Sequence, residues 1–174
     1  MKLINWVQFS WDLARLPESG ADLPEHYEIT PATVEDEKEL RRVITSSFAL
    51  DPEWNATMHE LLQTIDGWLD SAHATGANSA LVLRHGARII GASVLAAEAE
   101  GENHLCPGPC ILMEYRNRGF GTNLLDRSLR SLRDAGLTRA SGIAKENSPV
   151  TKVLYPKFGA TWGPYESPDL VAAA

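Results

Sequence analysis

The chain has little cysteine, no long apolar run and no recognisable leader, and each absence narrows the class of protein. Two cysteines among 174 residues cannot build a disulfide framework, which favours a reducing compartment. No apolar run approaches the ~18–20 residues that a membrane-spanning helix needs. The start of the chain has a short apolar patch without a small-residue cleavage site, so we expect no signal peptide. We therefore expect a cytoplasmic protein with no membrane partner.

The chain is also short of positive charge. Its 16 Lys and Arg against 23 Asp and Glu give a formal net charge of −7, which argues against a nucleic-acid partner held by a broad basic face. Between residues 116 and 157, however, nine basic side chains stand against three acidic ones. A basic segment in an acidic protein indicates one small polyanionic ligand. The ordinary alternative is a set of solvated helix faces.

What the chain does have is the composition of a globular domain, with 44% hydrophobic and 22% charged residues. We divide it into an N-terminal extension over 1–25, whose aromatic side chains pack on the domain or on a second subunit, a domain over 26–166 and a tail over 167–174. A capping box at Thr33–Asp36 marks the start of the first helix. Apolar periodicity predicts helices over 33–48, 55–72, 122–135 and 148–158, and strands over 27–29, 79–84, 88–95, 110–113, 138–144 and 160–165. This order predicts an α+β sandwich.

The most informative segment is the turn between the strand over 110–113 and the third helix. Gly119 and Gly121 let the backbone approach a ligand with no Cβ in the way. The first N–H groups of that helix lie at its positive end, where a diphosphate fits, and Arg116 and Arg118 can add charge-assisted hydrogen bonds. The ordinary alternative is a turn that lets helix and strand pack closely. A P-loop would need a Lys after the second glycine, and a Rossmann turn a third glycine, where Leu124 stands.

Two motifs point to one family. Arg116-x-x-Gly119-x-Gly121 after a short apolar strand resembles the acetyl-CoA motif of the GNAT superfamily of N-acetyltransferases. The segment from Leu154 to Gly159, Leu-Tyr-Pro-Lys-Phe-Gly, is similar to the family's ending of the helix after the fifth strand. The resemblance implies an α+β, GNAT-like fold: a mixed, mainly antiparallel central sheet flanked by helices in an α/β three-layer sandwich. It also implies acetyl-CoA as the acetyl-donor substrate.

The same resemblance implies which residues hold the donor. Main-chain groups of the strand and the side chain of Asn147 would bind the pantetheine arm, and the glycine turn would bind the diphosphate. The cofactor-binding residues implied in this way are Ile111, Leu112, Met113, Arg116, Asn117, Arg118, Gly119, Phe120, Gly121, Thr122 and Asn147.

Acyl transfer from a thioester to an amine needs a proton donor for the departing thiolate and a base or relay that makes the amine neutral. By the resemblance, Tyr155 takes the position of the donor, and the alternative is an ordinary half-buried tyrosine. For the base we single out His104, whose unperturbed pKa of about 6.5 suits proton transfer near neutrality. Glu98, Glu100 and Glu102 lie on the same segment, and for each of these four residues the alternative is a solvated loop. A backbone N–H of the strand over 110–113 is the natural donor to the developing oxyanion.

We therefore expect an acetyl-CoA-dependent N-acetyltransferase that acts on a primary amine by direct transfer and without a metal. Cys106 and Cys110 have no second Cys or His pair at metal spacing. Two other functions stay open: a non-catalytic CoA-binding sensor or interaction module of the same fold, and a nucleotide-dependent enzyme. The sequence leaves open whether the acceptor is a small-molecule or a protein amine, and whether the chain forms a homodimer.

Overall fold

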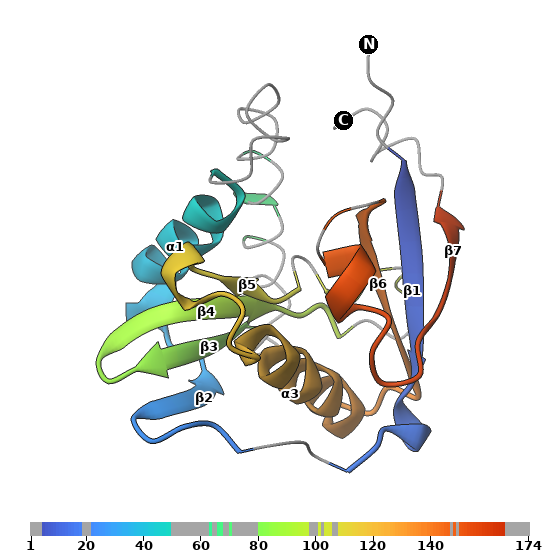
Figure 1. The fold of residues 1–174 in the computed structure, drawn as a ribbon, viewed down its shortest axis with the longest axis horizontal. Coiled ribbons are helices and arrows are strands. Elements are labelled where there is room, and N and C mark those ends of the chain that lie inside the picture. Colours follow the sequence, from blue (N-terminus) through green and yellow to red (C-terminus); the bar gives the residue numbers. More distant parts are fainter. Residues whose placement is uncertain are drawn as a thin grey trace.

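Two antiparallel sheets and two long helices form the described part of the computed structural model (Figure 1). It describes residues 5–18, 22–49, 63, 66, 67, 70, 80–97, 101, 103–105, 108–146, 148 and 150–165. The main elements are β1 (Trp6–Asp12), β2 (Tyr27–Pro31), α1 (Glu37–Ala49), β3 (Ala80–His85), β4 (Arg88–Val94), β5 (Cys110–Ile111), α3 (Phe120–Asp134), β6 (Arg139–Lys145) and β7 (Thr161–Tyr165). One sheet has the strand order β2-β3-β4-β5, and the other has the order β6-β1-β7. No helix among the described residues is both long and apolar enough to cross a membrane.

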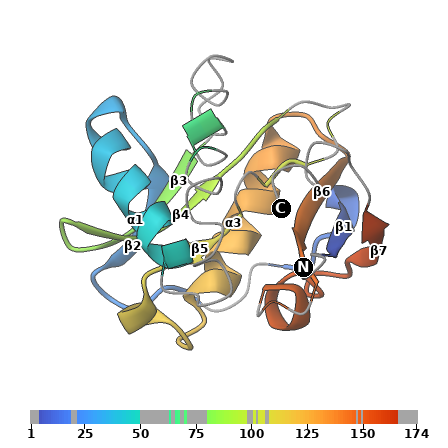
Figure 2. The ribbon, with the colours of Figure 1, turned by 90° about the horizontal axis from the view of Figure 1, so that it is seen from above.

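The two helices cover opposite faces of the four-stranded sheet. Figure 2 shows α1 on one side of this sheet and α3 on the other, between it and the strands β6 and β1. As expected, α3 ends before Gly136, whose φ of +103° is a left-handed conformation that favours glycine. The predicted α+β arrangement of mainly antiparallel strands with flanking helices is confirmed, with the described strands divided between two sheets. The leucines on the inner side of α3 are all buried: Leu124, Leu125, Leu129 and Leu132.

The start of α1 is fixed to the sheet by the predicted capping box. The main-chain N–H of Thr33 donates to Oδ2 of Asp36 at 2.8 Å, and Arg84 on β3 donates to the same oxygen at 2.6 Å. The hydrogen bond from Arg84, followed by that from Thr33, lowers the pKa of Asp36 below its usual value. Because the pKa is lowered on folding, this contribution to stability is present above about pH 4 and is lost as the pH falls further.

The middle strand of the three-stranded sheet, β1, comes from the segment that we expected to be an N-terminal extension. It pairs antiparallel with β6 along its whole length and with β7 on its other side. Val7, Phe9 and Trp11 alternate along it and are buried. These aromatic side chains pack on the domain, so this part of the chain is built into the fold and is not an appendage. We predicted no strand here, because both partners come after residue 138 and the local sequence does not reveal the pairing.

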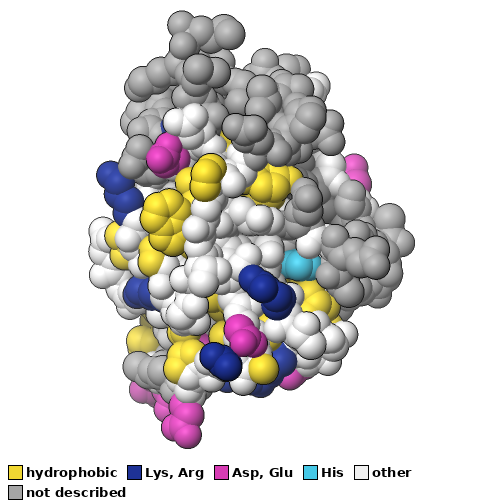
Figure 3. Space-filling model, turned by 90° about the vertical axis from the view of Figure 1, so that its right-hand side faces the viewer, with side chains coloured by type: hydrophobic (Ala, Val, Ile, Leu, Met, Phe, Trp, Pro, Cys, Tyr) yellow, Lys and Arg dark blue, Asp and Glu magenta, His cyan; other side chains and the backbone are white. Residues whose placement is uncertain are grey.

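The outer edge of the three-stranded sheet is β7. Figure 3 views the molecule from this side, and hydrophobic, basic and acidic side chains are interspersed over the described surface. Trp162 on β7 is 69% exposed. The described part of this face therefore presents no broad basic patch.

Two predicted elements differ from the structure. The helix expected over 148–158 is a single π-helical turn, Val150–Leu154, because Pro156 has no N–H to extend it and Phe158 has a left-handed φ of +61°. The strand expected over 110–113 ends at Ile111 and is followed by a 3₁₀ turn, Met113–Tyr115. The helix expected over 55–72, apart from single positions, and the tail over 167–174 lie outside the described residues.

Candidate active site

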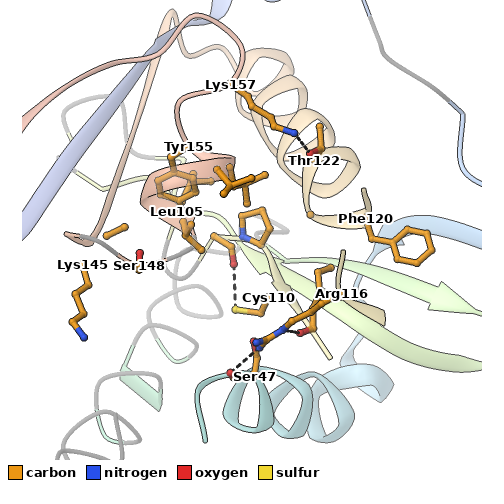
Figure 4. A pocket seen from close by; sticks show the side chains of 18 of the residues that line it. Ser47, Leu105, Cys110, Arg116, Phe120, Thr122, Lys145, Ser148, Tyr155 and Lys157 are labelled. Atoms are coloured by element: carbon orange, nitrogen blue, oxygen red, sulfur yellow. Dashed lines mark hydrogen bonds between the residues drawn. The ribbon is translucent and has the colours of Figure 1, made fainter. Parts of the chain in front are cut away.

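A pocket of about 440 Å³ lies between the two sheets, beside β5 and the end of β6 (Figure 4). The two motifs that the sequence analysis singled out meet at this pocket, although they are separated along the chain. Of the predicted site residues, Leu112, Met113, Arg118 and His104 do not line it. Those that do line it are Ile111, Arg116, Asn117, Gly119, Phe120, Gly121, Thr122 and Tyr155. Asn147, Glu98, Glu100, Glu102 and Cys106 lie outside the described residues.

The N-terminus of α3 forms one wall of the pocket. Gly119 precedes the helix with a left-handed φ of +82°, and a Cβ there would meet no atom within 4 Å. Glycine is therefore favoured by the backbone conformation and not by crowding. No side chain caps the helix at Gly119, and the carbonyl oxygen of this residue accepts from the N–H of Asn123 at 3.2 Å. The N–H groups of Phe120, Gly121 and Thr122 precede this hydrogen bond, so they lie at the positive end of the helix dipole without an intrahelical partner.

The charged side chains among the described lining residues are all basic: Arg116, Lys145 and Lys157. Lys157 lies beside the N-terminus of α3, where its Nζ donates to Oγ1 of Thr122 at 2.8 Å (Figure 4). The lysine and the helix dipole together give this wall a positive potential, which suits a polyanionic ligand. The sequence analysis counted Lys157 within the basic segment and gave it no role, because its contact with the start of α3 depends on the fold.

Arg116 braces the glycine turn. Its Nε donates to the carbonyl oxygen of Ile111 at 3.0 Å, and its Nη2 donates to the carbonyl oxygen of Ser47 at 3.0 Å (Figure 4). Since Ser47 lies in the last turn of α1, the guanidinium also sits at the favourable, negative end of that helix. Arg116 therefore ties the turn to β5 and to α1, and a contact with phosphate stays a prediction.

The main chain of the predicted pantetheine strand is already engaged within the protein. The N–H of Leu112 donates to the carbonyl oxygen of Ile90 at 2.9 Å, and the carbonyl oxygens of Leu112 and Met113 accept from Tyr115 and Arg116. A ligand could form only a second hydrogen bond to these carbonyl groups. The expected contacts of Leu112 and Met113 with pantetheine gain no support from this arrangement.

Arg118 lies beside the pocket, where it packs against an aromatic ring. Its guanidinium carbon is 5.5 Å from the ring centroid of Tyr115, a residue that lines the pocket. The hydroxyl of Tyr115 is 3.0 Å from Nδ1 of His85. This cation–π contact holds the guanidinium of Arg118 over the ring of Tyr115, beside the glycine turn.

Tyr155 lies at the pocket wall, as the resemblance implies, and only 3% of its surface is exposed. Its ring packs edge-to-face on Phe9 and Trp11 of β1, with centroid distances of 5.5 and 5.3 Å. A Cβ at Gly108 would overlap the hydroxyl oxygen, so the hydroxyl lies against the Gly108 main chain. The fold therefore holds both ends of this side chain.

His104 is a buried connector of the two sheets and does not reach the pocket. Its main-chain N–H donates to the carbonyl oxygen of Ser141 on β6 at 2.7 Å, and its carbonyl oxygen accepts from Ala96 after β4 at 3.0 Å. Its side chain is 3% exposed, and Nδ1 accepts from the N–H of Ser141 at 2.9 Å. The lone pair of Nδ1 is therefore used inside the protein, and the expected role of His104 as the base gains no support from its position and stays a prediction.

Cys110 lines the pocket as a buried thiol. Its Sγ donates to the carbonyl oxygen of Gly108 at 3.4 Å, and burial raises the pKa of the thiol to about 12. A thiol in this state is protonated near neutral pH and is a poor nucleophile.

We predict that Cys110 resists alkylation in the folded protein. Incubation with iodoacetamide at pH 8 should leave this residue unmodified, whereas the same treatment after unfolding should modify it completely. Peptide mass spectrometry locates the label, and the unfolded sample is the control. Extensive labelling of Cys110 without denaturant would contradict the buried, protonated state.

The sequence model of the acetyltransferase (GNAT) family matches residues 37–160, which include α1, the glycine turn and Tyr155. The chain belongs to this family. Membership supports acetyl-CoA-dependent acetyl transfer as the general class of activity. β1 lies outside the matched residues. No curated protein sequence matches the chain significantly.

Solved structures share the GNAT fold. A GCN5-related N-acetyltransferase from Sphaerobacter thermophilus has a TM-score of 0.67 and 15% identity, over 94% of this chain and 50% of that chain. A GNAT acetyltransferase from Colwellia psychrerythraea has a TM-score of 0.61 and 15% identity, over 92% and 53%. A glucosamine N-acetyltransferase region in a fungal multi-domain GH3 β-N-acetylglucosaminidase has a TM-score of 0.60 and 16% identity, over 92% and 20%. The chain thus spans about half the length of the two bacterial proteins, and at these identities the likeness shows the fold alone.

Proposed function

We propose that this GNAT protein transfers an acetyl group from acetyl-CoA to a primary amine by direct transfer. The observation that carries the proposal is one pocket bordered by the N-terminus of α3, where Gly119 offers no side-chain cap, by basic side chains and by Tyr155. Its volume of about 440 Å³ is in the range of small-molecule sites. The amide groups at the mouth of α3 and the Nζ of Lys157 are suited to the diphosphate of acetyl-CoA, because both present N–H donors and positive charge.

In this proposal Tyr155 donates the proton that the leaving group needs. The amine nitrogen forms a bond to the thioester carbonyl carbon, the carbon–sulfur bond breaks, and the phenolic proton passes to sulfur. The nitrogen loses one proton to solvent, from which the tyrosinate regains its own. The products are an acetylated amine and the free CoA thiol, so atoms and charge balance. The protonated state of Cys110 favours this direct route over an acetyl-cysteine intermediate at that residue.

Two measurements test the proposal. Isothermal titration calorimetry of the purified protein with acetyl-CoA should give a Kd well below 1 mM, and NADH or ATP under the same conditions should bind more weakly. A panel of primary amines should then include one that accelerates release of the CoA thiol. Absence of binding at millimolar acetyl-CoA would overturn the proposal. Binding without thiol release for any amine would instead support a non-catalytic CoA-binding module.

A further inference from the structure

The ring of Tyr155 packs on β1, a strand outside the segment that defines the family match. Trp11, which is fully buried, meets this ring edge-to-face at an interplanar angle of 84°. On the β6 side, a Cβ at Gly142 would lie 3.2 Å from Cε2 of Tyr155 and 3.3 Å from Cζ3 of Trp11. The two rings are therefore packed tightly enough against β6 that even a methyl group would displace them.

Trp11 also fixes the main chain that follows Tyr155. Its indole Nε1–H donates to the carbonyl oxygen of Lys157 at 2.9 Å. Lys157 is two residues beyond the tyrosine, and its side chain reaches back to Thr122 at the start of α3. One tryptophan thus contacts the tyrosine ring and anchors the turn that carries it.

The position of the Tyr155 hydroxyl group depends on where its ring is held. The hydroxyl oxygen lies against the main chain of Gly108 at the pocket wall, with no space for a side chain between them. A rotation or shift of the ring would therefore move the hydroxyl along this wall. Proton transfer is sensitive to such shifts, since a misplacement of 1 Å can reduce a rate about 10²-fold.

We propose that Trp11 is a positioning residue for Tyr155: its ring contact and its hydrogen bond to Lys157 keep the phenol where it can protonate the leaving thiolate. The inference rests on the proposed function, because it assumes proton donation by Tyr155. It adds a residue from the N-terminal strand to the machinery of the site. Trp11 does not line the pocket and acts only through Tyr155 and the turn that follows it.

A double-mutant cycle tests this inference. The variants are Trp11→Phe, Tyr155→Phe and the two combined, each assayed by thiol release from acetyl-CoA with the most effective amine of the panel. Trp11→Phe keeps an aromatic ring and loses the N–H, so we expect kcat to fall about tenfold while the Kd for acetyl-CoA stays unchanged. In the Tyr155→Phe background, Trp11→Phe should cause no further fall in kcat, because the phenolic proton that Trp11 helps to place is already absent. A purely structural role would lower kcat by the same factor in both backgrounds.

The matched control is Trp162→Phe. Trp162 lies on β7 of the same sheet, does not line the pocket and is largely exposed. Its ring centroid is 6.5 Å from that of Phe9, so it also belongs to the aromatic surroundings of β1. This substitution should leave kcat and Kd unchanged.

The outcomes separate the inference from the proposed function. Thiol release by the wild type together with unchanged kcat in Trp11→Phe, or equal losses in both backgrounds, would overturn the positioning role alone. No thiol release by the wild type with any amine would overturn the enzymatic proposal, and the inference with it. Should Trp11→Phe not fold, Gly142→Ala replaces it, because the added methyl group pushes on both rings. It should reproduce the fall in kcat, the unchanged Kd and the dependence on Tyr155.

Discussion

Replacing Tyr155 with Phe should lower kcat for acetyl transfer by about 10²-fold or more, within the range that general acid catalysis contributes. The substitution removes one oxygen and keeps the ring that packs on Phe9 and Trp11, so the fold and the pocket should be retained. The diphosphate end of acetyl-CoA is bound elsewhere in our proposal, so its Kd should change by less than about twofold. Thiol-release kinetics give kcat, and calorimetry gives the Kd.

The control for this substitution is Tyr27→Phe. Tyr27 lies on β2, stacks on His85 with a centroid distance of 4.3 Å and does not line the pocket. It should retain the kcat of the wild type. If Tyr155→Phe also retained it, proton donation would have to be assigned to another group.

Replacing Gly119 with Asp should weaken acetyl-CoA binding far more than replacing it with Asn. Both residues tolerate a left-handed conformation better than most side chains, and both fit the open space at this position. They differ in charge alone, and the carboxylate would face the bound diphosphate. Two like charges about 4 Å apart near a protein surface repel by about 4 kcal/mol, so we expect the Kd of the Asp variant to exceed that of the Asn variant by about 10²-fold or more. Calorimetry at low and high salt measures this difference, which salt should reduce.

Thermal melts and a second glycine supply the controls. Gly136, beyond the other end of α3, also has a positive φ and open space, so Gly136→Asn carries a similar backbone cost. It should lower the melting temperature about as much as Gly119→Asn and leave the Kd of acetyl-CoA unchanged. Equal affinities of the Asp and Asn variants at Gly119 would contradict a diphosphate site at this turn.

Local sequence signals predicted the elements that depend on neighbouring residues. Apolar periodicity located α3, and the two apolar runs on either side of Gly86 located the strands β3 and β4. The glycine turn and Tyr155 were found through two short motifs, and the fold brings both to one pocket. In each case the information lies within about fifteen residues of the feature, which is the range over which periodicity and turn chemistry act.

Features that depend on distant pairing were not predicted. The place of β1 follows from strands that come after residue 138, and the brace formed by Arg116 needs Ser47 from another helix. His104 was singled out as the base, with a solvated loop as the alternative, yet its segment crosses between the sheets and buries the ring. Such contacts are set by topology, and residue type alone does not reveal them.

The position of β1 also bears on how the molecule is made. A ribosome releases this strand well before β6 and β7, between which it is inserted. Until then the nascent chain carries the apolar Val7, Phe9 and Trp11 without a sheet to receive them, and closing so long a loop slows folding. Since Tyr155 packs on this strand, the nascent polypeptide can complete its cavity only after the strand has met these two later partners.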